Sequence, residues 1–218
     1  MVTIVEVPRQ VDHEERRREI IEALFRVATR DGLGAASVRA VAKEAGVPAP
    51  RVQYYFPTKT ELLDAAMLHL GQRVVGRGLA LQRAAGPDAT PETLLRAALG
   101  GSRPVDASTR HDIVLFFLFF IAALTDEVMA DTQLVQSQRF IGGFFTGWIR
   151  EAQERGEADP SLDPEHEARL ILFGNTGLIL AALAGVLSID EAVATIDDHL
   201  ARVFRAPPAS EPRQSSTR

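Results

Sequence analysis

The 218-residue sequence contains no cysteine. Disulfide frameworks, thiolate zinc sites and cysteine nucleophiles are therefore excluded. Histidine is scarce, and its spacing does not form the paired pattern that holds a metal ion. The histidines are His13, His69, His111, His166 and His199. We predict neither a metal nor another cofactor.

Several enzyme motifs are missing as well. The sequence has no His-Glu-x-x-His, no Gly-x-Ser-x-Gly and no phosphate-binding glycine loop. Its adjacent carboxylates, Asp126-Glu127 and Asp197-Asp198, have the pattern of helix-surface or terminal charges. An enzyme whose active site lies in the helical body is the rival interpretation. Because these motifs are missing, we expect that the chain is not an enzyme.

Long apolar runs are also absent. The longest near-continuous run covers residues 113–124, which as a helix is too short to span a bilayer. The sequence opens without the basic start and apolar stretch of a signal peptide. We therefore expect a cytoplasmic protein with no membrane partner.

The net charge of −5 is distributed unevenly along the chain. Residues 1–60 carry ten Lys/Arg and eight Asp/Glu, a net charge of +2, whereas residues 61–218 carry fourteen and twenty-one, a net charge of −7. A mildly basic head on an acidic body approaches a polyanion in one orientation. Chance is the alternative explanation of this asymmetry.

The hydrophobic pattern is helical, and no stretch alternates as a strand does, so we predict an all-α protein. Capping boxes begin at Asp12, Thr58 and Ser188, and Thr90 and Asp163 each precede a proline. About nine helices follow, with boundaries good to a few residues. Their expected ranges are 12–31, 37–45, 49–55, 58–85, 90–101, 106–127, 131–156, 163–187 and 189–205. The tail, 206–218, is rich in Pro and Ser, and we expect it to be disordered.

The first helix has one apolar and one basic face. The apolar stripe consists of Ile20, Ile21, Leu24, Val27 and Ala28. The basic face carries Arg16, Arg17, Arg18, Arg26 and Arg30. We interpret Arg16, Arg17 and Arg18 as solvated, with a contact to a DNA backbone as the alternative.

Two short helices follow, separated by a glycine turn at Gly46. The first begins at Ser37, and the second runs from Ala49 to Tyr55. This length and spacing are typical of a helix-turn-helix, whose second helix enters the major groove of DNA. On that helix Arg51 could pair with guanine and Gln53 with adenine, while tyrosines hold phosphates or pack on thymine and sugar. The tyrosines are Tyr54 and Tyr55.

The stretch GAASVRAVAKEAGVPAPRVQYYFPTKTELL, which begins at Gly34, resembles the TetR (tetracycline-repressor) family of transcription regulators. The signature is Ala-Gly-Val, a short recognition helix and then Tyr-Phe-Pro-x-Lys. The resemblance implies a three-helix head over 1–57 and a larger ligand-binding and dimerisation body over 58–205. It also implies that Ser37 caps its helix and touches a phosphate, that Lys59 binds a phosphate, and that Phe56 is a core residue. The predicted DNA-binding residues are Ser37, Arg39, Ala49, Arg51, Gln53, Tyr54, Tyr55 and Lys59.

The recognition helix departs from the family pattern at three positions. Pro48 stands where a Ser or Thr usually caps the helix, Pro50 replaces a frequent glycine, and Gln53 replaces a common tyrosine. Both prolines fall in the first turn, where the missing N–H costs little. These departures do not affect the fold assignment. Because they lie on the recognition helix, the family's base contacts cannot be assigned residue by residue to this chain.

Phenylalanine is concentrated in two helices of the body, over 106–127 and 131–156. Large rings beside glycines can leave a cleft for a ligand, and simple core packing is the alternative. The resemblance implies an inducer pocket in the body, for which this lining favours a hydrophobic or aromatic ligand. Asn175 lies in an apolar helix and needs a partner, which could be a ligand, a side chain or water. The candidate ligand-binding residues are Met67, Phe116, Phe117, Phe120, Phe144, Trp148 and Asn175.

The last two helices could pair with a second copy of the chain. One carries a stripe of small residues, and the other an apolar face, which together suit a four-helix interface. Intramolecular packing is the alternative, and the resemblance favours the dimer. The candidate interface residues are Gly174, Gly177, Ala181, Ala184, Val193, Ile196 and Leu200.

Together these features predict a homodimeric, ligand-responsive repressor. Its partners would be a small-molecule effector and double-stranded DNA with a palindromic operator, whose half-sites lie roughly 34–36 Å apart. Two alternatives remain open: an activator of the same family, or a helical protein-interaction module without DNA readout.

Overall fold

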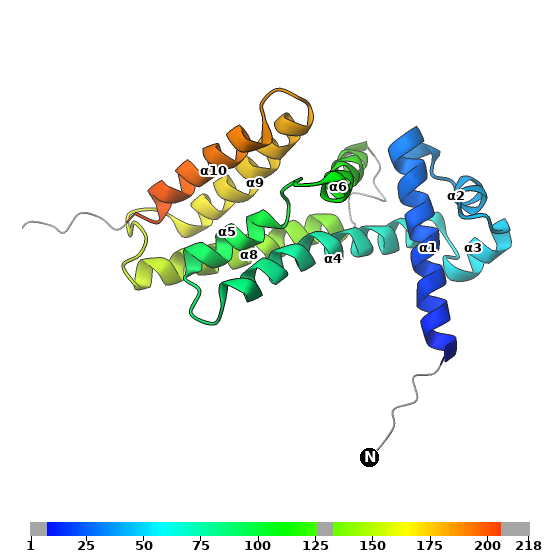
Figure 1. The fold of residues 1–218 in the computed structure, drawn as a ribbon, viewed down its shortest axis with the longest axis horizontal. Helices are drawn as coiled ribbons and strands as arrows, with labels where there is room; N and C mark the ends of the chain where they lie inside the picture. Colours follow the sequence, from blue (N-terminus) through cyan, green and yellow to red (C-terminus); the bar gives the residue numbers. More distant parts are fainter. Residues whose placement is uncertain (1–7, 126–132, 206–218) are drawn as a thin grey trace, which may run out of the picture. The chain divides into compact units, whose positions relative to one another are not determined.

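The computed structural model describes residues 8–125 and 133–205, and all regular structure in these ranges is helical (Figure 1). The prediction of an all-α chain is confirmed. The helices are α1 (Pro8–Asp31), a 3-10 turn η1 (Leu33–Ala35), α2 (Val38–Ala45), α3 (Ala49–Tyr55), α4 (Lys59–Ala85), α5 (Pro91–Gly100), α6 (Ala107–Thr125), α8 (Gln133–Glu154), α9 (Pro164–Leu183) and α10 (Ile189–Val203). The predicted tail, 206–218, and the expected helix ends at 127 and 131 lie outside the described residues.

Side-chain caps confirm most of the predicted helix starts. The hydroxyls of Thr58 and Ser188 each accept a hydrogen bond, at 3.1 Å, from the backbone N–H three residues on. Thr90 and Asp163 cap α5 and α9 in the same way. The predicted start at Asp12 is wrong, because α1 begins at Pro8. A proline suits that first helical position, where the N–H it lacks would have no intrahelical partner.

The end of α9 also differs from the prediction. The helix ends at Leu183, four residues before the expected end, and Ala184 is its C-cap. Gly185 adopts a φ of 77°, a left-handed conformation that glycine tolerates and other residues rarely adopt. The backbone N–H of Val186 then bonds back to the carbonyl of Ala181 at 3.0 Å. Ala184 therefore does not belong to the helical stripe of small residues.

The described chain forms two compact units. The first unit contains α1, α2, α3, the part of α4 up to Val75, and α6. The second contains the rest of α4 together with α5, α8 from residue 138, α9 and α10. These units do not coincide with the division at residue 57 that we expected between head and body.

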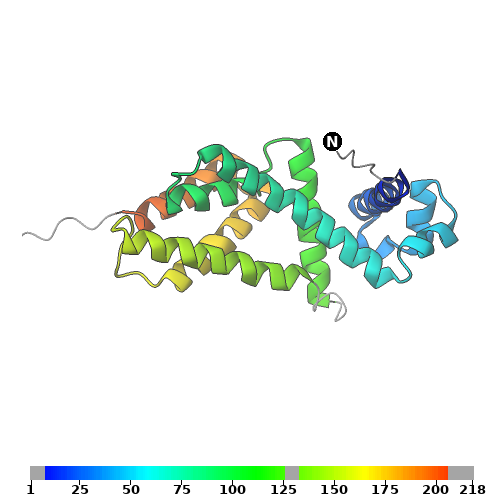
Figure 2. The ribbon, with the colours of Figure 1, turned by 90° about the horizontal axis from the view of Figure 1, so that it is seen from below.

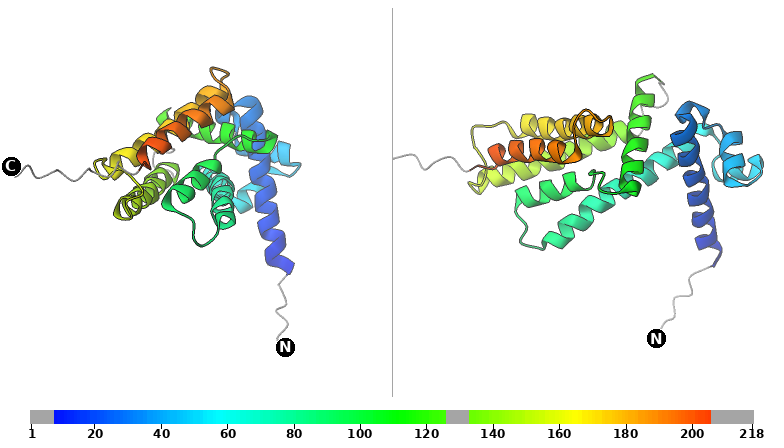
Figure 3. Two further views of the ribbon diagram at one scale, coloured as in Figure 1. Left: turned by 60° about the vertical axis from the view of Figure 1, so that its left-hand side comes forward. Right: turned by 45° about the horizontal axis from the view of Figure 1, so that its top comes forward.

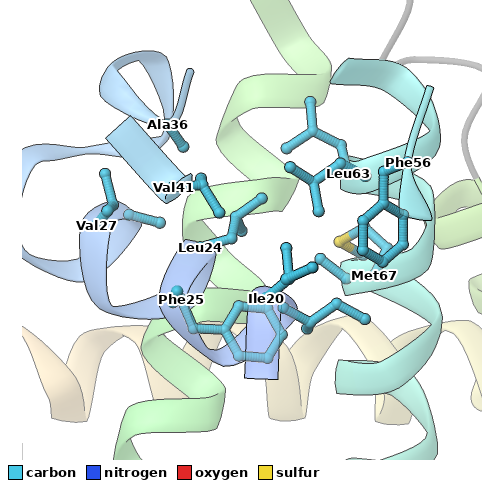
Figure 4. Close-up of a cluster of buried hydrophobic side chains, with 14 of the residues drawn as sticks. Ile20, Leu24, Phe25, Val27, Ala36, Val41, Phe56, Leu63 and Met67 are labelled. Carbon is cyan, nitrogen blue, oxygen red and sulfur yellow. The ribbon is translucent and has the colours of Figure 1, made fainter. Parts of the chain in front are cut away.

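The core of the first unit lies where α1, α2, α3, α4 and α6 meet. The predicted stripe of α1 is buried, and so is Phe25, which the stripe did not include. Figure 4 shows Leu24 and Phe25 of α1 in one cluster with Val41 of α2 and with Phe56. Leu62 of α4 and residues of α6 complete the cluster. The compact unit extends past residue 57 because apolar side chains of α4 and α6 are needed to cover this core.

The core of the second unit is built from α5, α8, α9 and α10. Helices α9 and α10 lie side by side (Figures 2 and 3). The buried residues of this core are Leu95, Leu99, Phe145, Ile149, Ala168, Ile171, Leu172, Ile196, Leu200 and Val203. An apolar stripe from each helix closes this unit against water.

Helix α6 is apolar over most of its length. Its window Ala107–Leu124 has a mean hydropathy of 1.6, and by length and composition it could cross a membrane. Core helices of soluble proteins pass the same test. Leu115 and Phe119 of α6 are fully buried in the core of the first unit. One side of α6 therefore packs into the core, and 33% of the window is buried in all.

Charged side chains join three helices of the first unit. Asp112 of α6 is fully buried and pairs with the Arg73 guanidinium at 2.6 Å. Arg73 also pairs with Glu22 of α1 at 2.9 Å, and Glu22 lies 3.3 Å from the imidazole of His69. The hydrogen bond from His69 and the charge of Arg73 hold the pKa of Glu22 below its ordinary value, against the opposing effect of burial. We call these four residues the Arg73 network.

Candidate nucleic-acid interface

Helix α2 and the turn after it have the geometry of a helix-turn-helix. The Ser37 hydroxyl caps α2 by accepting a hydrogen bond from the backbone N–H of Ala40 at 3.2 Å. Gly46 ends the helix with a φ of 67°. Val41 and Ala42 are buried in the core of the first unit. Both ends of α2 are therefore capped, and the turn leads directly into α3.

Helix α3 separates a buried from an exposed face over only seven residues. Val52 is buried, and Phe56, directly after the helix, is 1% exposed. Arg51 and Gln53 lie on the exposed side, and 73% of Tyr54 is exposed. The core thus holds α3 by its apolar side and leaves the polar side exposed.

The remaining predicted DNA-binding residues are also accessible. Ser37 and Arg39 are exposed at the start of α2, and Ala49 and Tyr55 are half-buried at the two ends of α3. Lys59 is exposed and is the first residue of α4. A helix N-terminus favours an anion, so a lysine there is well placed for a phosphate.

Two arginines on the basic face of α1 contact α2. Arg26 and Arg30 both bind the carboxylate of Glu44 in α2, at 2.8 and 2.9 Å. These two hydrogen bonds hold the pKa of Glu44 below its ordinary value. The contacts join α1 to the helix that precedes the recognition helix.

Arg17 departs from the prediction of solvated arginines, since it is half-buried and contacts the end of α3. Its guanidinium donates a hydrogen bond to the Tyr55 carbonyl at 2.7 Å, and its central carbon lies 4.4 Å from the centre of the Phe56 ring. One turn earlier, the His13 ring lies 4.7 Å from the ring of Tyr55. The partners lie about forty residues ahead in the sequence, and no local signal pointed to them.

The structure divides the seven candidate ligand-binding residues between the two units. In the first unit, Met67 and Phe117 are buried, Met67 as part of the core cluster in Figure 4. Phe116 and Phe120 are half-buried and stack on each other, with ring centres 6.1 Å apart. The burial of Met67 and Phe117 agrees with the core-packing alternative.

In the second unit, Phe144 is half exposed and stacks on the half-buried Trp148. Asn175 is buried and donates a hydrogen bond to the Ser102 hydroxyl at 3.1 Å. The side chain of Ser102 is therefore a partner of the Asn175 amide. Phe144 and Trp148 remain accessible candidates.

The candidate dimer residues also fall into two groups. Ile196 and Leu200 are buried in the core of the second unit, so the intramolecular alternative holds for these two residues. Gly174 and Gly177 are exposed, and a methyl group added to either would meet nothing within 4 Å. Ala181 is half-buried, Ala184 is exposed beyond the end of α9, and Val193 is half-buried. The outer face of α9 therefore remains available to a second chain.

Comparison with known proteins identifies both parts of the chain. Residues 20–66 match the model of the bacterial regulatory proteins of the tetR family, and residues 91–205 match the C-terminal domain of BetI-type transcriptional repressors. The HTH-type transcriptional regulator PksA of Bacillus subtilis (strain 168) is 34% identical over 188 residues, which cover 85% of this chain and 87% of PksA.

Two solved structures share the fold. A transcriptional regulator from Rhodococcus sp. Rha1 is 26% identical with a TM-score of 0.72, covering 86% of this chain and 95% of that one. Thermus thermophilus FadR, a TetR-family transcriptional repressor in complex with lauroyl-CoA, is 18% identical with a TM-score of 0.61, covering 90% and 99%. The helix-turn-helix, the two matched domains and the relation to PksA lead to one conclusion. The chain belongs to the TetR family and is a helix-turn-helix, DNA-binding transcriptional regulator.

Proposed function

We propose that this regulator is a repressor that leaves a palindromic operator when a small hydrophobic ligand binds its C-terminal domain. In this proposal residues 1–57 read the DNA, and residues 58–205 bind the ligand and dimerise. The observation that carries the proposal is the division of α3, whose Val52 is buried while Arg51 and Gln53 are exposed. A helix held in this way can enter the major groove without disturbing the core.

Each exposed residue has a chemical role in this proposal. Arg51 reads guanine through two hydrogen bonds, and Gln53 reads adenine in the same way. Tyr54 contacts a phosphate or packs on a thymine methyl group. Ser37 and Lys59 bind phosphates on either side of α3 and set the position of the helix on the duplex. Arg39 is at most a further phosphate contact.

TetR regulators function as dimers, and the outer face of α9 is our proposed dimer surface. It combines the exposed Gly174 and Gly177 with large apolar side chains that a monomer would leave in water. These exposed side chains are Leu170, Phe173 and Leu180. Glycines allow a partner helix to approach closely, and the large residues supply apolar area. A symmetric dimer then presents two copies of α3 to two half-sites.

The effector in our proposal is a hydrophobic or aromatic molecule of low charge. Support comes from Phe144 and Trp148 on α8 of the second unit, whose rings stack on each other and are not fully buried. The long acyl chain of the ligand bound to Thermus thermophilus FadR has the same apolar character. A ligand of this kind releases DNA only to the extent that it binds the DNA-free conformation more tightly.

We further expect a cytoplasmic regulator without catalytic activity, as its relatives are transcriptional regulators. An activator of the same family would bind the operator equally but raise transcription. A reporter gene placed behind the operator distinguishes the two, because a repressor lowers reporter output and the effector restores it.

Substitution of Arg51 and Lys59 should separate base reading from phosphate binding. Arg51→Ala should cost about 1–3 kcal/mol on the operator and much less on scrambled DNA. Lys59→Ala should weaken both duplexes equally and lower the slope of log affinity against log salt by about 0.9. Fluorescence anisotropy titrations at several salt concentrations measure both effects. Equal losses of Arg51→Ala on the two duplexes would contradict the assignment of Arg51.

The proposed function is tested with the intergenic DNA beside the gene for this chain. Anisotropy at two salt concentrations, with a scrambled duplex as control, should show selective binding by two protomers per pair of half-sites. A panel of hydrophobic compounds is then added, and release by one of them supports the effector proposal. Without selectivity on this DNA, a genome-wide selection of bound fragments is the next measurement. Salt-insensitive binding without any selectivity would instead indicate a protein-interaction module.

A further inference from the structure

The recognition helix α3 is short and poorly capped by its own sequence. It has seven residues, and Pro48 at its N-cap offers no side-chain hydrogen bond. Its last turn contains no basic residue, and its C-cap is Phe56 rather than glycine. The final carbonyls of a helix have no partner within the helix and carry a partial negative charge. A cationic donor from elsewhere in the chain would therefore stabilise the C-terminal end of α3.

Arg17 of α1 supplies this donor. Its guanidinium donates to the carbonyl of Tyr55, the last residue of α3, at 2.7 Å. The same group lies over the ring of Phe56, with its central carbon 4.4 Å from the ring centre. A planar guanidinium can make both contacts at once, whereas a lysine ammonium is a point charge and cannot stack.

His13 extends the contact between α1 and α3 by one turn. Its ring lies 4.7 Å from that of Tyr55 and 6.3 Å from that of Tyr54, and the two tyrosine rings meet edge to face at 5.1 Å. Residues 13 and 17 are four apart and so lie on the same face of α1. This face contacts the end of α3 that carries both tyrosines.

We propose that Arg17 is a positioning residue for DNA recognition: it fixes the C-terminal end of α3, and with it the tyrosines, in the orientation that reads the operator. Its guanidinium is engaged within the protein and does not serve as a phosphate contact. Arg17 thus affects selectivity through α3, although it touches no base. The proposal rests on α3 being the helix that enters the groove.

The first test needs no DNA. The chain has two tyrosines, Tyr54 and Tyr55, and both lie on α3. Protein labelled with 3-fluorotyrosine therefore gives two fluorine resonances, which a Tyr54→Phe variant assigns. Arg17→Ala should shift the Tyr55 resonance, and Arg17→Lys should restore it in part because lysine keeps the hydrogen bond but not the stacking. Arg18→Ala is the matched control: it removes the same charge from the neighbouring, exposed position. Unchanged tyrosine resonances in Arg17→Ala would overturn the proposal.

The second test measures binding to operator and scrambled duplexes across a range of salt concentrations. Arg17→Ala should lower operator affinity roughly tenfold, the effect expected from losing a hydrogen bond to a charged group. Affinity for scrambled DNA and the salt slope should stay close to those of the unmodified protein. A parallel loss on both duplexes, with a slope lower by about 0.9, would mean that Arg17 binds a phosphate and would overturn the proposal. If no operator were found, the DNA-reading role of α3 would fail, but the fluorine result on Arg17 would still stand. The proposed function and the contact of Arg17 with α3 are therefore tested separately.

Discussion

Arg73→Ala is expected to lower the free energy of unfolding by about 3–5 kcal/mol, the typical cost of removing one partner from a buried ion pair. Asp112 is fully buried, and the Arg73 guanidinium at 2.6 Å is its counter-charge. The substitution also removes the contact of Arg73 with Glu22, so α1, α4 and α6 lose a shared charge network. Urea denaturation followed by circular dichroism, at equal protein concentrations because dimers gain stability with concentration, measures the effect.

Two further variants make this prediction specific. Arg155→Ala also breaks an ion pair, with Glu151, but both side chains are nearly half exposed, and the loss should be below about 1 kcal/mol. The double substitution Arg73→Met with Asp112→Leu removes both charges, and apolar replacement of a buried pair is often neutral or stabilising. The double variant should therefore recover most of the loss. An Arg73→Ala cost no larger than that of Arg155→Ala would refute the account.

Phe56→Ala should produce a loss of similar size, about 3–5 kcal/mol, because it leaves a large cavity in a well-packed core. The ring is 1% exposed and lies in the cluster that joins α1, α2, α3 and α4. It also carries the stacked guanidinium of Arg17. Because Phe56 is the C-cap of α3, operator affinity should fall together with stability.

Tyr54→Ala is the matched control for Phe56→Ala, two residues away and largely exposed. It should change the free energy of unfolding by no more than about 0.5 kcal/mol, as surface substitutions usually do. Its operator affinity should nevertheless fall, since we assign Tyr54 to the DNA surface. Thermal unfolding and anisotropy on the same samples separate the two effects. If Tyr54→Ala were the more destabilising of the two, the division of α3 into a buried and an exposed side would be incorrect.

Much of this protein follows from the sequence by itself. Helix starts are encoded in a few adjacent residues, as at Thr90-Pro91 and at Ser188 with Glu191, and the glycine turn at Gly46 is equally local. The same locality explains why the helix-turn-helix and the exposed residues of α3 could be predicted. Errors arose where two signals competed, as at Asp12, which has a capping pattern but lies inside a helix that begins at Pro8.

Only the tertiary structure decided which surfaces meet. The apolar pattern of α10 predicted that Ile196 and Leu200 are buried, but not that they are buried within their own chain. That Met67 packs in the core cluster of the first unit was likewise not evident from the sequence. Arg17 binds a carbonyl 38 residues away, and Arg73 joins side chains 39 and 51 residues distant. A side-chain pattern shows which face of a helix avoids water or carries charge, but the partner of that face depends on how the helices pack.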